Sequence, residues 1–272
     1  MKIRTSGLPK NLDRRIGLKI KYTKNIPIIL PHLKKLSDKL DYFEFGLRET
    51  EDYRDYKKLI KDSDLFVTLH GPLYEENVNL IVPQKNKVNL RNLKFCQEAA
   101  DYFNAKYIVL HPGDRETPEA SLENLYYLLD KVKDKRFILE NTPIKIKNRP
   151  YERLGVYIKD FLGFKEKGID MCFDFGHARV ETEIERKKYY AYTSNFIKKV
   201  NPQYFHLSGN DGTYDYHWII RDKRSLIDYS KILPFLPKNA LLTLEIDFFD
   251  KSDGFDKEKV LKDIDYLRKL IN

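Results

Sequence analysis

Hydrophobic and polar positions along the chain follow two alternating patterns. Short runs rich in Ile, Val, Phe and Leu recur, and longer stretches with apolar residues at helical spacing lie between them. A buried strand produces the first pattern and an amphipathic helix the second. Eight strands are expected, over residues 15–22, 41–46, 65–71, 107–113, 137–142, 170–176, 204–209 and 241–247. This order predicts βα units that feed a parallel sheet.

The predicted helices each have one apolar face. Three are marked by apolar residues at helical spacing, namely Leu93, Cys96, Ala100 and Phe103, then Leu122, Leu125, Leu129 and Val132, and finally Val260, Ile264, Leu267 and Ile271. Thr117, Pro118 and Glu119 stand in the order that a helix start prefers, so one helix is expected to begin there.

A doubly wound open sheet would also alternate strands and helices, but it usually has a glycine-rich loop after its first strand, and this chain has none. We therefore predict an α/β protein with a single (β/α)8 TIM barrel. The whole chain, residues 1–272, is expected to form one domain, with residues 1–13 as a short N-terminal arm.

Composition narrows the class of protein. Hydrophobic residues make up 42% and charged residues 33% of the chain, as in a globular protein. The start has no apolar leader and no apolar run is long enough for a membrane span, so a cytoplasmic protein without a membrane partner is expected. Cys96 and Cys172 lie in apolar stretches and are expected in the core. The net charge of +9 suits a polyanionic partner, but the lysines are scattered along the helices.

Polar residues gather where the predicted strands end. The carboxyl ends of barrel strands form one mouth, where the active sites of such barrels lie. The residues at these ends and in the loops that follow are His70, His111, Glu140, Asp174, His177, His206, Asp215, His217 and Glu245. A single histidine is more often a packing residue than a ligand, but five of six histidines at equivalent positions indicate a site.

Imidazole and carboxylate together suit zinc, manganese or iron, and a carboxylate between two such groups can bridge ions. Nine ligand candidates exceed what one ion can use, so we predict two to three metal ions, with Zn2+ first and Mn2+ or Fe2+ as alternatives. The register leaves open whether Glu44 faces the barrel interior, and we interpret it as structural, with a substrate contact as the alternative. His32 is interpreted as a surface or packing residue.

These residues resemble the xylose isomerase-like barrel superfamily and, within it, the endonuclease IV family of metal-dependent abasic-site endonucleases. The resemblance covers residues 65–245 and rests on His70-Gly71-Pro72, Leu110-His111-Pro112-Gly113, Glu140-Asn141-Thr142, Asp174 with His177, His206, Asp215 with His217, and Glu245. It implies one ion at His70, His111 and Glu140, a second at Glu140, Asp174, His206 and Glu245, and a third at His177, Asp215 and His217.

Some segments depart from that family. Residues 15–23 lack its histidine and paired glycines, residues 142–147 replace its glycine-rich loop, and the tyrosine after His70 is displaced to Tyr74. Phe43-Glu44-Phe45 is instead similar to the second strand of sugar isomerases.

The resemblance implies a hydrolase that cleaves DNA at abasic sites during repair, with Glu140 and Glu245 as catalytic residues. Arg48, Arg115 and Lys145 are expected to contact the nucleic-acid backbone. The alternative is an isomerase or epimerase that acts on a small sugar or phosphorylated substrate, in which Glu140 and Glu245 exchange a proton with carbon and His177 binds substrate. A scaffold that has lost catalysis is a third interpretation. A monomer is expected in each case.

Overall fold

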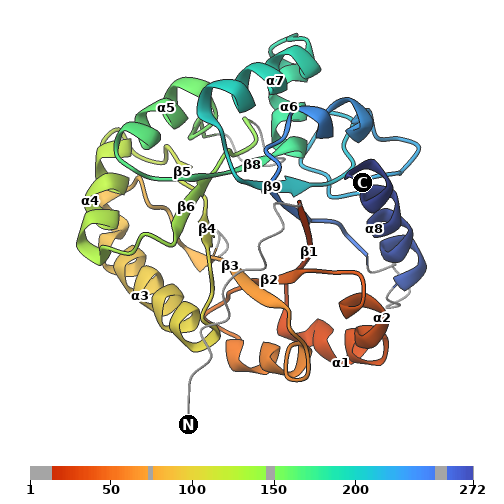
Figure 1. Ribbon diagram of the computed structural model, residues 1–272. Coiled ribbons are helices and arrows are strands. Elements are labelled where there is room, and N and C mark those ends of the chain that lie inside the picture. Colours follow the sequence, from red (N-terminus) through yellow and green to blue (C-terminus); the bar gives the residue numbers. More distant parts are fainter. Residues whose placement is uncertain (1–13, 73–75, 145–150, 249–255, 272) are drawn as a thin grey trace.

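The computed structural model describes residues 14–72, 76–144, 151–248 and 256–271. Eight parallel strands close into a barrel in the order β1-β10-β9-β8-β6-β4-β3-β2, surrounded by helices (Figure 1). The strands are β1 (Arg15–Ile20), β2 (Tyr42–Gly46), β3 (Phe66–His70), β4 (Ile108–Leu110), β6 (Phe137–Glu140), β8 (Met171–Asp174), β9 (Tyr204–Leu207) and β10 (Leu241–Leu244). Each falls within a range predicted from the sequence, so the (β/α)8 barrel is confirmed.

Long helices follow most strands on the outside of the barrel. They are α3 (Asn86–Phe103), α4 (Leu122–Val132), α5 (Ile158–Glu166), α6 (Phe175–Ile184), α7 (Tyr189–Val200) and α8 (Lys257–Ile271). A small antiparallel pair, β5 (Gly113–Asp114) with β7 (Arg153–Leu154), lies beyond the ends of β4 and β6. The predicted N-terminal arm, residues 1–13, lies outside the described residues.

The segments after β1, β2 and β9 contain only short helices. These are η1 (Thr23–Asn25), α1 (Ile26–Ile29), η2 (Leu30–His32), α2 (Leu33–Ser37), η3 (Tyr53–Leu59), η6 (Tyr229–Lys231) and η7 (Leu233–Phe235). Another short helix, η5 (Pro83–Lys85), precedes α3. Pro27 and Pro31 interrupt the segment after β1, because proline lacks the N–H that a continuous helix needs.

The helix start predicted at Thr117-Pro118-Glu119 is wrong. These residues form a turn in which the Ala120 N–H donates to the Thr117 carbonyl at 3.1 Å. Helix α4 begins at Leu122 after Ser121, whose N–H donates to the Ile81 carbonyl at 2.9 Å. This contact with a distant segment sets the start of the helix, and local sequence gives no sign of it.

Inward-facing side chains fill the barrel in layers. Near the bottom, Val109, Ile138 and Leu241 form an apolar layer with Tyr42 and Tyr204. Gly17 leaves room for the Tyr42 ring, since a β-carbon there would lie 2.2 Å from that ring.

Above this layer the tyrosine hydroxyls meet two threonines. Tyr204 OH lies 2.7 Å from Thr68 Oγ1 and 2.9 Å from Thr243 Oγ1, and Tyr42 OH lies 2.7 Å from Thr243 Oγ1. Side chains on a strand alternate between its two faces, so the residue two places further on in each strand also faces inward. Those next residues form the floor of the site.

The larger core lies between the barrel and the helices and contains residues such as Leu18, Phe45, Leu69 and Phe173. Cys96 and Cys172 are both buried and free, as predicted. Among the described residues, no helix has the length and apolar character needed to span a membrane.

Candidate metal centre

The nine residues singled out from the sequence converge at the carboxyl end of the barrel. They come from β3, β6, β8 with the first turn of α6, β9 with its following loop, and the residues just after β4 and β10. Asp174 pairs directly with His206 in the strand register. His70 pairs with Val109 and Glu140 with Cys172, so in these two cases the candidate ligand on the next strand lies two residues further on and faces the same side.

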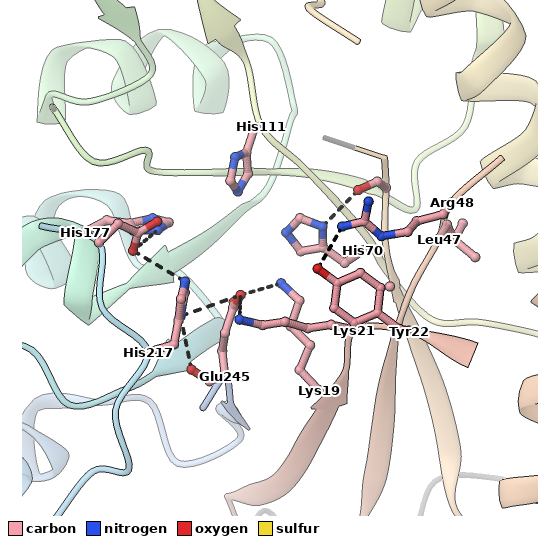
Figure 2. A pocket seen from close by; sticks show the side chains of 13 residues that line it. Lys19, Lys21, Tyr22, Leu47, Arg48, His70, His111, His177, His217 and Glu245 are labelled. Atoms are coloured by element: carbon pink, nitrogen blue, oxygen red, sulfur yellow. Dashed lines mark hydrogen bonds and ion pairs between the residues drawn. The ribbon is translucent and has the colours of Figure 1, made fainter. Parts of the chain in front are cut away.

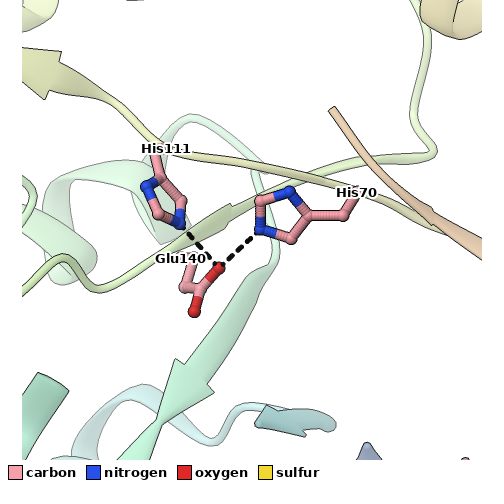
Figure 3. A group of neighbouring side chains, drawn as sticks. All are labelled: His70, His111 and Glu140. Atoms are coloured by element: carbon pink, nitrogen blue, oxygen red, sulfur yellow. Dashed lines mark hydrogen bonds and ion pairs between the residues drawn. The ribbon is translucent and has the colours of Figure 1, made fainter. Parts of the chain in front are cut away.

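Glu140 is the centre of this arrangement. Its side chain is fully buried, and its Oε2 lies 3.1 Å from His70 Nε2 and 3.0 Å from His111 Nε2 (Figure 3). Its other oxygen, Oε1, lies 2.9 Å from His206 Nδ1. Three imidazoles from three different strands therefore point at one carboxylate, which is the geometry of a bridging ligand.

Three groups among the described residues are compact enough to hold a metal ion, and all three contain Glu140. Ligand atoms lie within 4.8 Å of one another in the group of His70, His111 and Glu140, in the group of Glu140, Cys172 and His206, and in the group of Glu140, Asp174, His206 and Glu245. Asp174 Oδ2 is buried and has no hydrogen-bond partner among the described residues. A buried carboxylate oxygen without a partner is costly, so a cation at this place fits the residues present.

The third group, His177 with Asp215 and His217, is more open. The Nε2 atoms of His177 and His217 lie 3.3 and 3.5 Å from Asp215 Oδ1. The opposite nitrogens are held by backbone carbonyls: His177 Nδ1 lies 2.6 Å from Asn141 O, and His217 Nδ1 lies 3.2 Å from Glu245 O. Both rings therefore direct Nε2 toward Asp215, where a cation could bind. Metal-binding histidines usually have this arrangement, with the second ring nitrogen bound to a carbonyl or carboxylate.

Asn141, which follows Glu140, links strands β6 and β8 through hydrogen bonds with Asp174. Its side chain donates to the Asp174 carbonyl at 3.0 Å and accepts from the Asp174 N–H at 2.6 Å. Asp174 in turn caps helix α6 by accepting from the His177 N–H at 2.6 Å. These contacts fix β6, β8 and the start of α6 relative to one another, and with them three candidate ligands.

The loop after β9 is stiffened by aromatic stacking. Tyr216 and Trp218 are stacked with ring centroids 4.6 Å apart, and the Arg224 guanidinium lies 4.1 Å from the Trp218 ring. Tyr216 and Trp218 alternate with Asp215 and His217 along the chain. The stack therefore holds the two candidate ligands in place although they belong to a loop.

Burial and charge divide the histidines into two kinds. Burial lowers the pKa of His111 to about 4, so this ring is neutral near pH 7. Burial would also lower the pKa of His177, but Asp174 and Asp215 raise it to about 10. Burial raises the pKa of Asp174 to about 6, with Glu140 and Glu245 adding to the effect. Such opposed shifts in one cluster are typical of a functional site.

Sequence reasoning missed the role of Glu44. Its side chain faces the barrel interior and is fully buried, with Oε2 2.9 Å from His206 Nε2 and the Tyr204 hydroxyl donating to the same oxygen. A carboxylate on one imidazole nitrogen leaves the other nitrogen, here Nδ1, to face the centre. Burial would raise the pKa of Glu44, but His206 and Lys19 lower it to about 2.

Lys19 was also missed. Its ammonium is buried and lies 2.9 Å from Glu245 Oε1 and 3.3 Å from Glu44 Oε1. It therefore ties β1 to β2 and β10 and adds a fixed positive charge beside the candidate ligands. Gly17 and Lys19 are two residues apart on β1, so both face the barrel interior. The sequence does not show which face this is, because the answer depends on the pairing of β1 with β2.

A pocket of about 300 Å³ opens above the centre. His70, His111, His177, Asp215, His217 and Glu245 line one part of it, and Lys19, Lys21, Tyr22 and Arg48 line another (Figure 2). Of the basic residues expected to contact DNA, Arg48 lines the pocket, Arg115 is exposed elsewhere beside Glu152, and Lys145 lies outside the described residues. Tyr74 also lies outside them.

Known proteins share both this fold and parts of this sequence. The uncharacterized protein MJ1188 of Methanocaldococcus jannaschii is 25% identical over 220 residues, which cover 75% of this chain and 77% of that protein. A crystal structure of a D-tagatose 3-epimerase-like protein is similar with a TM-score of 0.69 and 17% identity, covering 94% of this chain and 96% of the other. Endonuclease IV from Thermus thermophilus is similar with a TM-score of 0.62 and 16% identity, covering 94% and 99%.

These two similarities show the fold alone. One of the two proteins is an endonuclease and the other is epimerase-like, so they do not decide between the two activities. The sequence matches the family described as xylose isomerase-like TIM barrel over residues 35–270. This match includes every candidate ligand from His70 to Glu245, and the chain belongs to the xylose isomerase-like TIM barrel family.

Proposed function

We propose that this chain is a metal-dependent phosphodiester hydrolase that cleaves DNA at abasic sites. The observation that carries the proposal is the convergence of the nine candidate ligands at one end of the barrel, with Glu140 shared by the compact groups and His177, Asp215 and His217 lining the adjacent pocket. A sugar isomerase of this superfamily needs a single ion, for which Glu140, Asp174, His206 and Glu245 suffice. His70, His111 and the pair Asp215 and His217 are surplus to that need.

The residues present fit two to three ions, with zinc preferred by this set of imidazoles and carboxylates. One ion would be held by His70, His111 and Glu140, a second by Glu140, Asp174, His206 and Glu245, and a third by His177, Asp215 and His217. Divalent ions in such a site lower the pKa of water to about 7 and stabilise negative charge on a phosphate.

The protein's own side chains hold the candidate ligands in position. Glu140, fixed by imidazoles on both oxygens, is proposed to bridge two ions and to orient the attacking water. Glu245 uses Oε1 to bind Lys19, which leaves Oε2 directed at the centre, where it lies 2.8 Å from His206 Nδ1. Glu44 fixes the ring of His206 from behind. The site is thus organised before substrate binds, which is a main source of catalytic power in enzymes.

The test is cleavage of a duplex oligonucleotide that contains one tetrahydrofuran abasic analogue, by protein loaded with zinc or manganese. Strand scission at the analogue, lost in Glu140→Gln and weakened by added salt, is the expected result, because phosphate contacts are screened by ions. An undamaged duplex of the same sequence is the control substrate. Absence of scission by fully loaded protein on several duplex lesions would overturn the proposal.

The second candidate is a sugar or sugar-phosphate isomerase or epimerase. It is favoured by two observations, the small size of the pocket and the placement of two carboxylates, Glu140 and Glu245, at 2.9 and 2.8 Å from the same Nδ1 of His206. In that reaction the two carboxylates would exchange a proton with a substrate carbon, and His177 would bind substrate. Incorporation of deuterium from heavy water into a sugar phosphate, without any cleavage of DNA, would select this candidate.

A further inference from the structure

The pocket wall is divided by charge according to strand. The nine candidate ligands come from β3 round to β10, and neighbouring strands β1 and β2 contribute none of them. The ends of β1 and β2 instead supply Lys19, Lys21 and Arg48. We call these three residues the cationic arc.

We propose that the cationic arc is a second subsite, made of residues other than the candidate metal ligands and adjacent to Glu245, which binds a phosphate group of the substrate. The inference rests on the proposed function in one respect: it takes the metal ligands to hold the reacting group. The arc then binds a further phosphate of the same substrate, one that does not react.

The side chains of the arc are placed for this task. Lys21 and Arg48 are 26% and 23% exposed, so both are partly desolvated and still open to the pocket. Arg48 lies over the Tyr22 ring at 4.4 Å and donates to the Tyr22 hydroxyl at 3.3 Å (Figure 2). This contact orients the guanidinium without neutralising its charge.

The acidic partners of the arc leave most of that charge available. Arg48 Nη1 is 3.8 Å from Glu76, and Lys21 Nζ is 3.9 Å from Glu245 and 3.2 Å from Asp247, which is 65% exposed. Charge-assisted hydrogen bonds are normally shorter, about 2.7–2.9 Å. Lys19 differs, because it already binds Glu245 and Glu44 closely, and it sets the inner limit of the arc.

Overall charge agrees with a role in anion binding. Five buried or pocket carboxylates lie on the metal side, namely Glu44, Glu140, Asp174, Asp215 and Glu245. Two or three divalent ions would neutralise most or all of that negative charge. The arc would then leave the loaded pocket positive, and a pocket of positive potential concentrates phosphate esters.

The phosphate has two chemical sources, which the experiment distinguishes. In a DNA strand it is the phosphate next to the one cleaved, and in a small sugar phosphate it is the terminal ester. We would measure calorimetrically, with zinc-loaded protein, the affinity for thymidine 3′,5′-bisphosphate against thymidine 5′-monophosphate, and for fructose 6-phosphate against fructose.

The variant is Lys21→Met with Arg48→Met, and the matched control is Lys87→Met with Lys94→Met, two exposed lysines of α3. In the wild type, the ligand with the additional phosphate should bind about tenfold more tightly or better in one of the two pairs. This factor corresponds to the usual free energy of a hydrogen bond between charged groups. The gain should vanish in the variant, stay in the control, and stay in the charge-keeping swap Lys21→Arg with Arg48→Lys. Zinc content should be equal in all four proteins.

A gain with the bisphosphate alone identifies a strand phosphate, and a gain with the sugar phosphate alone identifies a small ester. No gain in either pair, or a gain that survives in the methionine variant, overturns the inference. Neither result depends on cleavage of abasic DNA, so the inference and the proposed function fail separately.

Discussion

The double change Asp215→Ala with His217→Ala separates a three-ion site from a site with fewer ions. Both side chains belong to the loop after β9, at the open edge of the pocket, and they are 23% and 16% exposed. Neither belongs to the group of His70, His111 and Glu140 or to the group around Asp174. The variant should therefore lose one ion and keep the two others.

The size of the effect follows from the contacts. In metal-free protein, the change removes the acceptor of His177 Nε2 at 3.3 Å, while Nδ1 keeps the Asn141 carbonyl. One lost partner of a buried polar group costs about 1–3 kcal/mol of unfolding free energy, which a barrel of this size tolerates. Loss of an ion that stabilises the transition state by about 4 kcal/mol should slow hydrolysis about a thousandfold.

Metal content is measured by elemental analysis after dialysis, together with the rate of cleavage of abasic DNA and thermal unfolding in a chelator. His32→Ala with Asp38→Ala, at the end of η2 and just after α2, is the matched control and should keep metal content and activity. A double variant with full metal content and full activity would show that Asp215 and His217 are only loop residues beside the site.

Three further predictions concern the centre itself. Glu140→Gln removes the carboxylate shared by the compact groups, so elemental analysis should find the ions that depend on Glu140 lost and at most the one beside His177 retained. Lys19→Met removes the buried ammonium that Glu245 and Glu44 share, so chemical denaturation of metal-free protein should show a loss of about 3–5 kcal/mol, and added zinc should reduce it; an equal loss with and without zinc would contradict this. The pKa of about 10 at His177 means that this ring must release a proton to bind metal, so zinc affinity there should rise up to about tenfold per pH unit between about pH 6.5 and 8. Calorimetry in buffers of different ionisation enthalpy measures that proton, and zinc uptake without proton release would refute the assignment.

The barrel was predictable because its signals are local. Most strands are short runs rich in apolar residues with polar residues at or just after the carboxyl end, and the parity of side chains on a strand needs no tertiary information. Val109 on β4 and His111 just after it, like Ile138 and Glu140 on β6, show this parity within the sequence. The convergence of the nine residues then follows from the closure of the sheet.

Glu44 and Lys19 were not predictable in the same way. Both lie inside strands whose neighbours are also apolar or basic, so the alternation that marks a face is weak. Their orientation depends on the pairing of Gly17 with Tyr42 and of Lys19 with Glu44. The prediction of where α4 starts was wrong for a similar reason, because a backbone contact with Ile81 outweighed a good local capping sequence.

The number of metal ions per chain tests the central claim most directly. Protein purified without added metal, and the same protein after exposure to zinc and removal of the excess, would be analysed for bound transition metals. The proposed centre predicts two to three ions per chain, with zinc the main one. At most one ion per chain in both preparations would contradict the multinuclear site and leave the single-ion isomerase as the better interpretation.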